Sequence, residues 1–386
     1  MKTLLKFWIC LLWLTSSLAF GADVKDIKAG DSFDIDSTVL GERRHILVYL
    51  PRSYAMSEAR YPVLYLTDGD THILHTNGTL DFLARNNSVP EMIVVGVTNT
   101  DRTRDLTPTT SKDPDLKTAG GADKFLKFFE EELIPAINQR YRSTSYKVFA
   151  GHSLGGLFAI HTYLSHPNAF DAYIAVSPSL WWDDRLIVKR AEAVFTDHKA
   201  QGVLFMSLGG EGKRMREPFD EFKVIMQKNA GSDLHFVTQI FEEESHGSVV
   251  LLSHYLGLKS VFFDWPVARD ASFQQMLDHY AALSRRMKYT ITAPELMVNN
   301  FAYSLMGQKK LDEAIDVMVW NTRTYPASAN TYDSLCEALS NAERLQDAKL
   351  QCEKAVSLGQ TNVDPKLPEF RNNLSKLNAT IQATGP

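Results

Sequence analysis

The sequence is poor in cysteine and in long apolar runs. Its 386 residues include three cysteines, at positions 10, 336 and 352. Beyond the N-terminus, no apolar run is long enough to cross a membrane as a helix. The formal net charge is −5 and no basic run occurs, so nothing in the composition indicates nucleic-acid binding. Because metal-ligand spacings and phosphate-binding loops are also missing, we expect no metal and no cofactor.

The first 21 residues have the character of a secretory signal peptide. Lys2 and Lys6 give a positive start, residues 7–14 form a short apolar core, and residues 17–21 offer small residues for cleavage. An N-terminal membrane anchor is the alternative, because an aromatic residue interrupts the cleavage site. We expect the segment 1–21 to be removed, which would leave a periplasmic or secreted protein without a membrane span.

Apolar segments that predict strands alternate with helical patterns in the next part of the chain. The strand segments are 45–50, 61–67, 92–98, 146–150, 172–176, 203–208 and 234–241. The helical patterns are 123–137, 154–164, about 218–228 and 249–263. This alternation predicts an α/β domain over residues 22–267, with a mostly parallel sheet covered by helices on both faces. Ligands of such sheets bind beyond the carboxyl ends of the strands.

The pattern changes after a linking helix predicted at 268–290. Strand signals end near residue 293, and residues 307, 311, 313 and 314 resemble those 34 positions later. A 34-residue period of paired helices is typical of tetratricopeptide repeats, so residues 291–386 are predicted to form a helical region of this kind. A helical tail without repeats is the alternative. Such repeats could recruit a protein partner.

Two cysteines fall within this predicted helical region. On the repeat pattern, Cys336 and Cys352 lie on the inward faces of two antiparallel helices. They could form a disulfide in an oxidising compartment. Two buried free thiols are an equally good interpretation.

The segment Gly151-His152-Ser153-Leu154-Gly155 matches the pattern Gly-x-Ser-x-Gly. In this pattern the serine occupies a strained turn between a strand and a helix, and the flanking glycines let the neighbouring backbone pass closely. The strand-like residues 146–150 and the helical residues 154–164 supply the required context. We therefore predict Ser153 to be a nucleophile. The alternative is an ordinary glycine-rich turn that closes a βα unit.

A serine nucleophile needs a base, and the base needs an acid to orient it. Among eleven histidines, His246 alone lies in a loop between a late strand and a helix, although it could merely cap that helix. Glu211 follows the strand 203–208 and is our preferred acid. Glu217 is the second choice, and one of the glutamates at 242–244 is a third.

Two backbone N–H groups are expected to form the oxyanion hole. One belongs to Leu154, directly after the nucleophile. The other belongs to Asp70, in the turn that follows the strand 61–67. Asp68 is predicted to be structural, since it would hold this turn.

Several further residues are candidates for substrate binding. Arg104 could hold an anionic or polyhydroxylic substrate, or could pair with Asp105. Trp181 and Trp182 could wall an acyl or aromatic pocket, although such residues are also common in cores. His72, with His75 near it, could line the same cleft.

Five segments together resemble the esterase D-like family of α/β-hydrolases, which includes siderophore esterases, feruloyl esterases and mycolyltransferases. These segments are 61–70, 102–108, 151–156, 177–182 and 245–248. The resemblance implies Ser153 as nucleophile, His246 as base, and Asp70 and Leu154 as oxyanion donors. It leaves the acid open, because some siderophore esterases of the family use a Ser–His pair.

We therefore expect a serine esterase that works through an acyl-enzyme, on a siderophore-type ester or another polar ester. An acyltransferase on the same fold is one alternative. A binding or scaffold protein with an inactive hydrolase body is the other.

Overall fold

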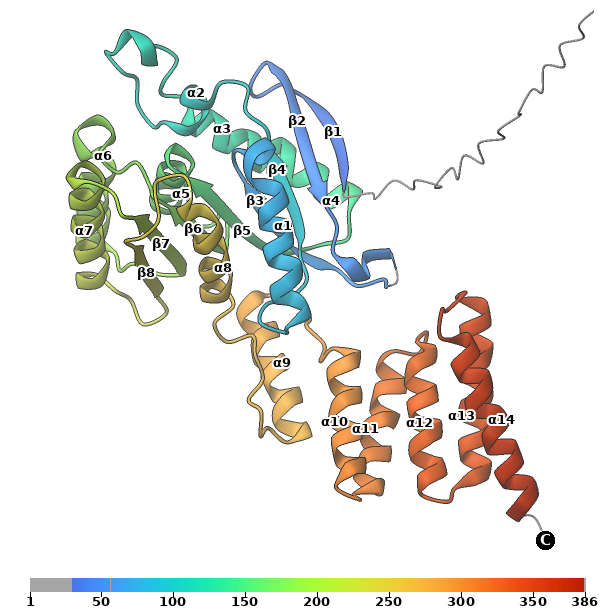
Figure 1. Ribbon diagram of the computed structural model, residues 1–386. Helices are drawn as coiled ribbons and strands as arrows, with labels where there is room; N and C mark the ends of the chain where they lie inside the picture. The colour runs from blue at the N-terminus through green and yellow to red at the C-terminus, as the bar shows by residue number, and fades with distance from the viewer. Residues whose placement is uncertain (1–29, 56, 385–386) are drawn as a thin grey trace, which may run out of the picture.

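The computed structural model describes residues 30–55 and 57–384 (Figure 1). An α/β part with a mostly parallel sheet comes first, and a series of helices follows, which confirms the predicted fold class. The predicted signal peptide, residues 1–21, lies outside the described residues. Within the described residues, no helix is both long enough and apolar enough to span a bilayer.

The central sheet has eight strands in the order β1-β2-β4-β3-β5-β6-β7-β8. The pairs β1–β2 and β2–β4 are antiparallel, and all pairs from β4 to β8 are parallel. The strands are β1 Asp31–Ser37, β2 Glu42–Tyr49, β3 Tyr61–Leu66, β4 Ile93–Val97, β5 Ser143–His152, β6 Ala172–Val176, β7 Val203–Gly209 and β8 His235–Phe241.

Helices cover both faces of this sheet, which explains why β3, β4 and β6 are buried at every position. One face packs against α1 Gly69–Arg85 and α8 Val249–Val261. The other packs against α3 Ala122–Phe128, α5 Leu154–Ser165, α6 Trp182–Asp197 and α7 Lys213–Lys228. A short helix, α2 Arg102–Leu106, follows β4.

The helix predicted at 123–137 is divided in the structure. A π-helical turn over Phe129–Leu133 separates α3 from α4 Ile134–Arg140. Pro135 explains the interruption, because its ring excludes the carbonyl four residues earlier and it has no N–H to donate. The helices α1 and α6 are absent from the sequence prediction, and α7 begins five residues before the predicted start.

The C-terminal helices are α9 Phe273–Met287, α10 Glu295–Gly307, α11 Leu311–Thr324, α12 Ala329–Asn341, α13 Leu345–Thr361 and α14 Leu367–Thr384. The ends of α10 and α12 lie 34 residues apart, as do the starts of α11 and α13. The helix spacing thus follows the predicted period. The tetratricopeptide-like assignment, the domain boundaries and a protein partner stay predictions.

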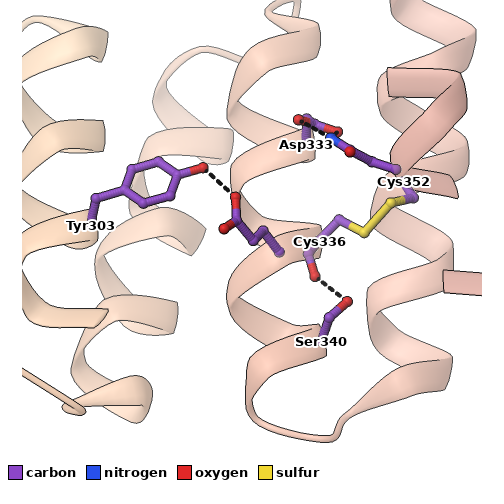
Figure 2. The surroundings of a disulfide bond; sticks show 7 residues. Tyr303, Asp333, Cys336, Ser340 and Cys352 are labelled. Carbon is purple, nitrogen blue, oxygen red and sulfur yellow. Dashed lines mark hydrogen bonds between the residues drawn. A yellow bond between two sulfur atoms is a disulfide. The ribbon is translucent and has the colours of Figure 1, made fainter. Parts of the chain in front are cut away.

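Cys336 and Cys352 form a disulfide that joins α12 to α13 (Figure 2). Both residues are buried, and their Cα atoms lie 5.3 Å apart. Of the two interpretations left open by the sequence, the structure has the bonded one.

The helical region joins the α/β part at the amino end of β5. There the Ser145 hydroxyl donates to the Lys288 carbonyl at 3.4 Å, and Arg286 binds Asp264 in a two-pronged ion pair. From Ser145 to the turn at Ser153, β5 spans roughly 25 Å at the usual rise of a strand. The helices therefore attach where the parallel strands begin (Figure 1). Ligands of this fold bind at the opposite end, beyond the carboxyl ends of the strands.

Candidate active site

Ser153 lies between the last residue of β5 and the first residue of α5, in an uncommon backbone conformation. Its φ is 61° and its ψ is −113°, in a region that non-glycine residues rarely occupy. A Cβ on Gly151 would come within 2.2 Å of the Gly155 carbonyl oxygen, and a Cβ on Gly155 would come within 2.4 Å of Thr67 Oγ1. Both glycines are therefore sterically required, and the turn presents the serine at the edge of the sheet.

The serine hydroxyl belongs to a continuous chain of hydrogen bonds. Ser153 Oγ lies 3.0 Å from His246 Nε2, and His246 Nδ1 lies 2.8 Å from Glu211 Oε2. Since a carboxylate only accepts, Nδ1 carries the proton and Nε2 is free to accept from the serine. This is the order of contacts that activates a serine hydroxyl.

Glu211 is held by three donors. Besides His246, the Ser177 hydroxyl donates to its Oε1 at 2.5 Å and the Gly209 N–H donates at 3.2 Å. Burial of the carboxylate works against its charge, but the hydrogen bonds from His246, Ser177 and Gly209 outweigh it and keep the pKa of Glu211 below its ordinary value. The side chain is therefore an anion at neutral pH, as an acid that orients a histidine must be.

The other candidate acids have different partners. Glu217 binds Arg185 at 2.8 Å on an exposed part of α7. Glu242 binds Arg216 at 3.1 Å. The structure brings Glu211, rather than either of these, to His246 Nδ1.

The two predicted oxyanion donors lie in the first turns of helices. Leu154 is the first residue of α5 and Asp70 the second of α1, where N–H groups have no acceptor within the helix. The two turns are adjacent, because Gly155 faces Thr67 and Asp68 at the end of β3. Two helix N-termini thus converge on the edge that carries Ser153, where they favour negative charge.

Asp68 fixes the turn from which Asp70 projects. Arg102 binds it with two nitrogens, at 2.6 and 3.1 Å, and Asn99 donates to it at 2.7 Å. The same guanidinium donates to the carbonyl of His152, next to the nucleophile, at 3.1 Å. Arg102 therefore ties the two turns together, and sequence reasoning missed it by selecting Arg104 from the same segment.

Arg104 and Trp182 are engaged elsewhere in the structure. Arg104 forms ion pairs with Glu42 at 2.6 Å and with Asp105 at 2.7 Å, so the predicted alternative of pairing describes it better than substrate binding. Trp182 is buried in the core and its indole N–H donates to Thr109 Oγ1 at 3.0 Å. Burial removes it from any pocket wall, whereas Trp181 remains partly exposed.

Four histidines gather behind the site, on α1, β5 and α8. His152 Nε2 donates to the carbonyl of His246 at 2.7 Å, and its ring centroid lies 4.6 Å from that of His246. His72 contacts both His152 and His75, and His254 stacks on His75. His72 and His75, predicted to line the cleft, are thus members of this cluster.

The cluster is held in the neutral state. Burial, together with the neighbouring imidazoles of His246 and His72, lowers the pKa of His152 to about 4. Burial likewise places the pKa of His254 well below its ordinary value. No group of three or more potential ligands among the described residues could hold a metal ion.

Known esterases are similar to this chain in sequence. The siderophore triacetylfusarinine C esterase of Aspergillus fumigatus is 34% identical over 193 residues, which are 43% of this chain and 65% of that protein. The ferri-bacillibactin esterase BesA of Bacillus subtilis is 34% identical over 177 residues, which are 40% of this chain and 58% of that protein. The chain thus spans less than two thirds of the length of these relatives.

A solved structure and a family model extend the comparison. The crystal structure of an IroE-like serine hydrolase from Shewanella oneidensis superposes with a TM-score of 0.70 at 29% identity, and covers 76% of this chain and 99% of that one. The model of an esterase family matches residues 37–229, half of the chain and the part that carries Ser153 and Glu211. The chain belongs to this esterase family.

Proposed function

We propose that the protein is a serine esterase that hydrolyses a carboxylic ester through a covalent acyl-enzyme. The observation that carries this proposal is the chain of contacts from Ser153 through His246 to Glu211, at 3.0 and 2.8 Å. The three residues come from three different strand ends, so their convergence is a property of the fold rather than of one local turn.

Ser153 Oγ attacks the ester carbonyl while His246 Nε2 accepts its proton. The N–H groups of Leu154 and Asp70 stabilise the negative charge that develops on the carbonyl oxygen. The anionic Glu211 stabilises the imidazolium and keeps its Nδ1 proton in place. His246 then gives its proton to the departing alcohol, and an acyl group remains on Ser153.

A water molecule completes the reaction. His246 removes a proton from the water, whose oxygen attacks the acyl carbon and forms a second tetrahedral intermediate. When this intermediate collapses, the proton returns to Ser153 and the carboxylic acid is released.

We further propose a siderophore-type or similar polar ester as the substrate. The support is that the two curated relatives described above are named for siderophore esters. An export signal at residues 1–21 and a periplasmic or secreted location are proposed with it. The disulfide between α12 and α13 supports this location, because such bonds persist in oxidising compartments.

Replacement of the nucleophile tests the proposed mechanism. Ser153→Ala is expected to lower kcat on p-nitrophenyl esters by more than about 10³-fold, because the acyl-enzyme can no longer form. Ser165→Ala, at the other end of α5, is the matched control and should retain activity. Full activity of the Ser153→Ala protein would exclude the mechanism.

A further inference from the structure

A tryptophan and an arginine are stacked beside the candidate triad. The Arg214 guanidinium carbon lies 3.7 Å from the centroid of the Trp181 ring. Trp181 is partly exposed and Arg214 is exposed, so solvent or a ligand can reach both. A guanidinium over an indole face is a favourable cation–π arrangement, and it leaves the edge of the guanidinium free to donate hydrogen bonds.

Both members of this pair are tied closely to the reacting groups. The Ser179 N–H donates to the Ser153 carbonyl at 3.1 Å, and Ser179 Oγ lies 3.3 Å from Ser153 Oγ. Trp181 follows Ser179 by two residues, and Arg214 follows Glu211 by three. The stacked pair is therefore close along the chain to residues that contact the nucleophile or its base, and we call it the rim of the site.

Arg214 has no carboxylate partner among the residues that the structure describes. Two nearby arginines each bind two carboxylates: Arg216 binds Asp220 and Glu242, and Arg185 binds Glu217 and Glu221. By contrast, no described carboxylate lies within ion-pairing distance of Arg214 or of its neighbour Lys213. The rim of the site therefore presents positive charge that a ligand can use.

The backbone after the tryptophans fixes this arrangement. Asp183, Asp184 and Arg185 have φ values of 44°, 50° and 60°, a left-handed turn that L-residues adopt only under constraint. The constraint comes from buried Trp182 and from Thr109, which accepts from the Trp182 indole and donates to Asp183 at 2.8 Å. The residues on both sides of Trp181 are thus held in place, and its ring also packs against Trp182 at a centroid distance of 6.0 Å.

We infer that Trp181 and Arg214 form a subsite that selects esters carrying an anionic group, preferably on or beside an aromatic ring. The indole offers an apolar plane and the guanidinium offers donors for a carboxylate or phenolate. This inference rests on the proposed esterase function. It adds a preference for negatively charged substrates, which the hydrogen-bonded residues Ser153, His246 and Glu211 do not supply.

Matched pairs of esters test the subsite. p-Nitrophenyl butyrate is compared with p-nitrophenyl hemisuccinate, and phenyl acetate with 4-carboxyphenyl acetate, so that each pair differs in one negative charge on one side of the ester. For the charged member of at least one pair, Arg214→Gln is expected to raise KM roughly five- to tenfold, with the neutral member changed less than twofold. Added salt should likewise weaken the preference of the wild type for the charged ester, because it screens the charge of Arg214.

Two further variants separate charge from structure. Lys228→Gln removes the same charge from the opposite end of α7 and should leave both members of each pair unchanged. Arg214→Lys should restore part of the preference, because it keeps the charge. An equal effect of Arg214→Gln on charged and neutral esters, or no effect on any of them, would overturn the inference.

A binding measurement keeps this test separate from that of the catalytic mechanism. Calorimetric titration of the full chain compares benzoate with benzamide, its uncharged analogue of similar shape. Benzoate is expected to bind more tightly, and Arg214→Gln should abolish the difference. If no ester in the panel is hydrolysed but benzoate still binds through Arg214, the mechanism fails and the subsite stands. If esters are hydrolysed and the two compounds bind alike, the subsite fails.

Discussion

At the scale of single residues, Glu211 decides whether a triad or a Ser–His pair operates. Its carboxylate accepts hydrogen bonds from Ser177 and Gly209 as well as from His246, so its orientation does not depend on the histidine alone. A buried anion held in this way can keep the Nδ1 proton of His246 in place throughout the reaction.

We predict that Glu211→Gln lowers kcat by about 10²- to 10⁴-fold, because an amide can donate to Nδ1 and select the wrong tautomer of His246. Glu217→Gln is the matched control, since Glu217 binds Arg185 at the surface. Steady-state kinetics on a p-nitrophenyl ester measures the effect. Near-normal activity of the Glu211→Gln protein would favour a Ser–His pair.

His152 is the second residue whose role can be measured. Its side chain donates to the backbone carbonyl of His246, so it fixes the base through the main chain. His152→Phe is expected to lower kcat by about tenfold, as a lost buried hydrogen bond of about 1.4 kcal/mol implies. His152→Gln keeps a donor and should retain most of the activity. Equal activity of both variants would show that the hydrogen bond does not position the base.

The sequence identifies Ser153 as a candidate because it lies in a segment with strict local demands, and His246 because it alone among the histidines lies in a loop between a late strand and a helix. A side chain at Gly151 or Gly155 would clash with neighbouring atoms, so both positions beside Ser153 require glycine. This requirement is visible in the sequence as the Gly-x-Ser-x-Gly pattern. Arg102 and Arg214 carry no such local sign. Their partners come from distant segments, so the directions of their side chains depend on tertiary structure.

At the scale of elements, the apolar strands were predictable and some helices were not. β6 coincides with its predicted range, because a strand buried on both faces is a continuous apolar run. α1 was missed because it begins directly at the turn after β3, and because polar residues and the exposed Gly78 separate its few buried side chains. α6 was missed since its first turn is left-handed, which no helix signal describes.

The histidine cluster joins α1, β5 and α8, and it should make the protein sensitive to acid. Burial lowers the pKa values of His72, His75, His152 and His254 in the folded state, while the unfolded chain keeps values near 6.5. Below that value the unfolded state binds more protons, so the free energy of unfolding falls as the pH falls. For His152 this loss continues until about pH 4.

Urea unfolding between pH 7.5 and 4.5 measures this dependence. The stability of the wild type is expected to decrease steadily below about pH 6.5. His152→Gln removes one of the four groups and should make the decrease shallower. An identical slope for both proteins would contradict the assignment of a lowered pKa to His152.

At the scale of the whole molecule, the helical region joins the α/β part at the amino end of β5 (Figure 1), whereas Ser153 follows the carboxyl end of that strand. The disulfide joins two helices of this region across a sequence separation of 16 residues. Changes to the disulfide should therefore affect the stability of these helices without affecting the chemistry at Ser153.

The double variant Cys336→Ala/Cys352→Ala is expected to lose about 3 kcal/mol of stability in the helical region, from the entropy of a loop of this length. Hydrogen exchange of α12 and α13 measures the loss, and kcat on a p-nitrophenyl ester should stay within twofold of the wild type. A large fall in kcat with intact exchange protection of β5 would show that the helical region and the candidate site are coupled.

For the helical region, the spacing of the helices could be predicted from the sequence, but their attachment to the α/β part could not. Its 34-residue spacing was predictable because small and apolar residues recur at fixed intervals. Its attachment at the amino end of β5 was not, since the contacts of Ser145 and Arg286 follow from packing between parts of the chain that share no pattern.

Detection of the acyl-enzyme would test the proposed mechanism without an intermediate assumption. Wild-type protein is mixed with p-nitrophenyl acetate, quenched with acid during turnover, digested and analysed by mass spectrometry. We expect an acetyl group on Ser153 in the wild type, and none at this position in the Ser153→Ala protein. Rapid turnover by the wild type with no acyl group on Ser153, or with the group on another residue, would contradict the mechanism.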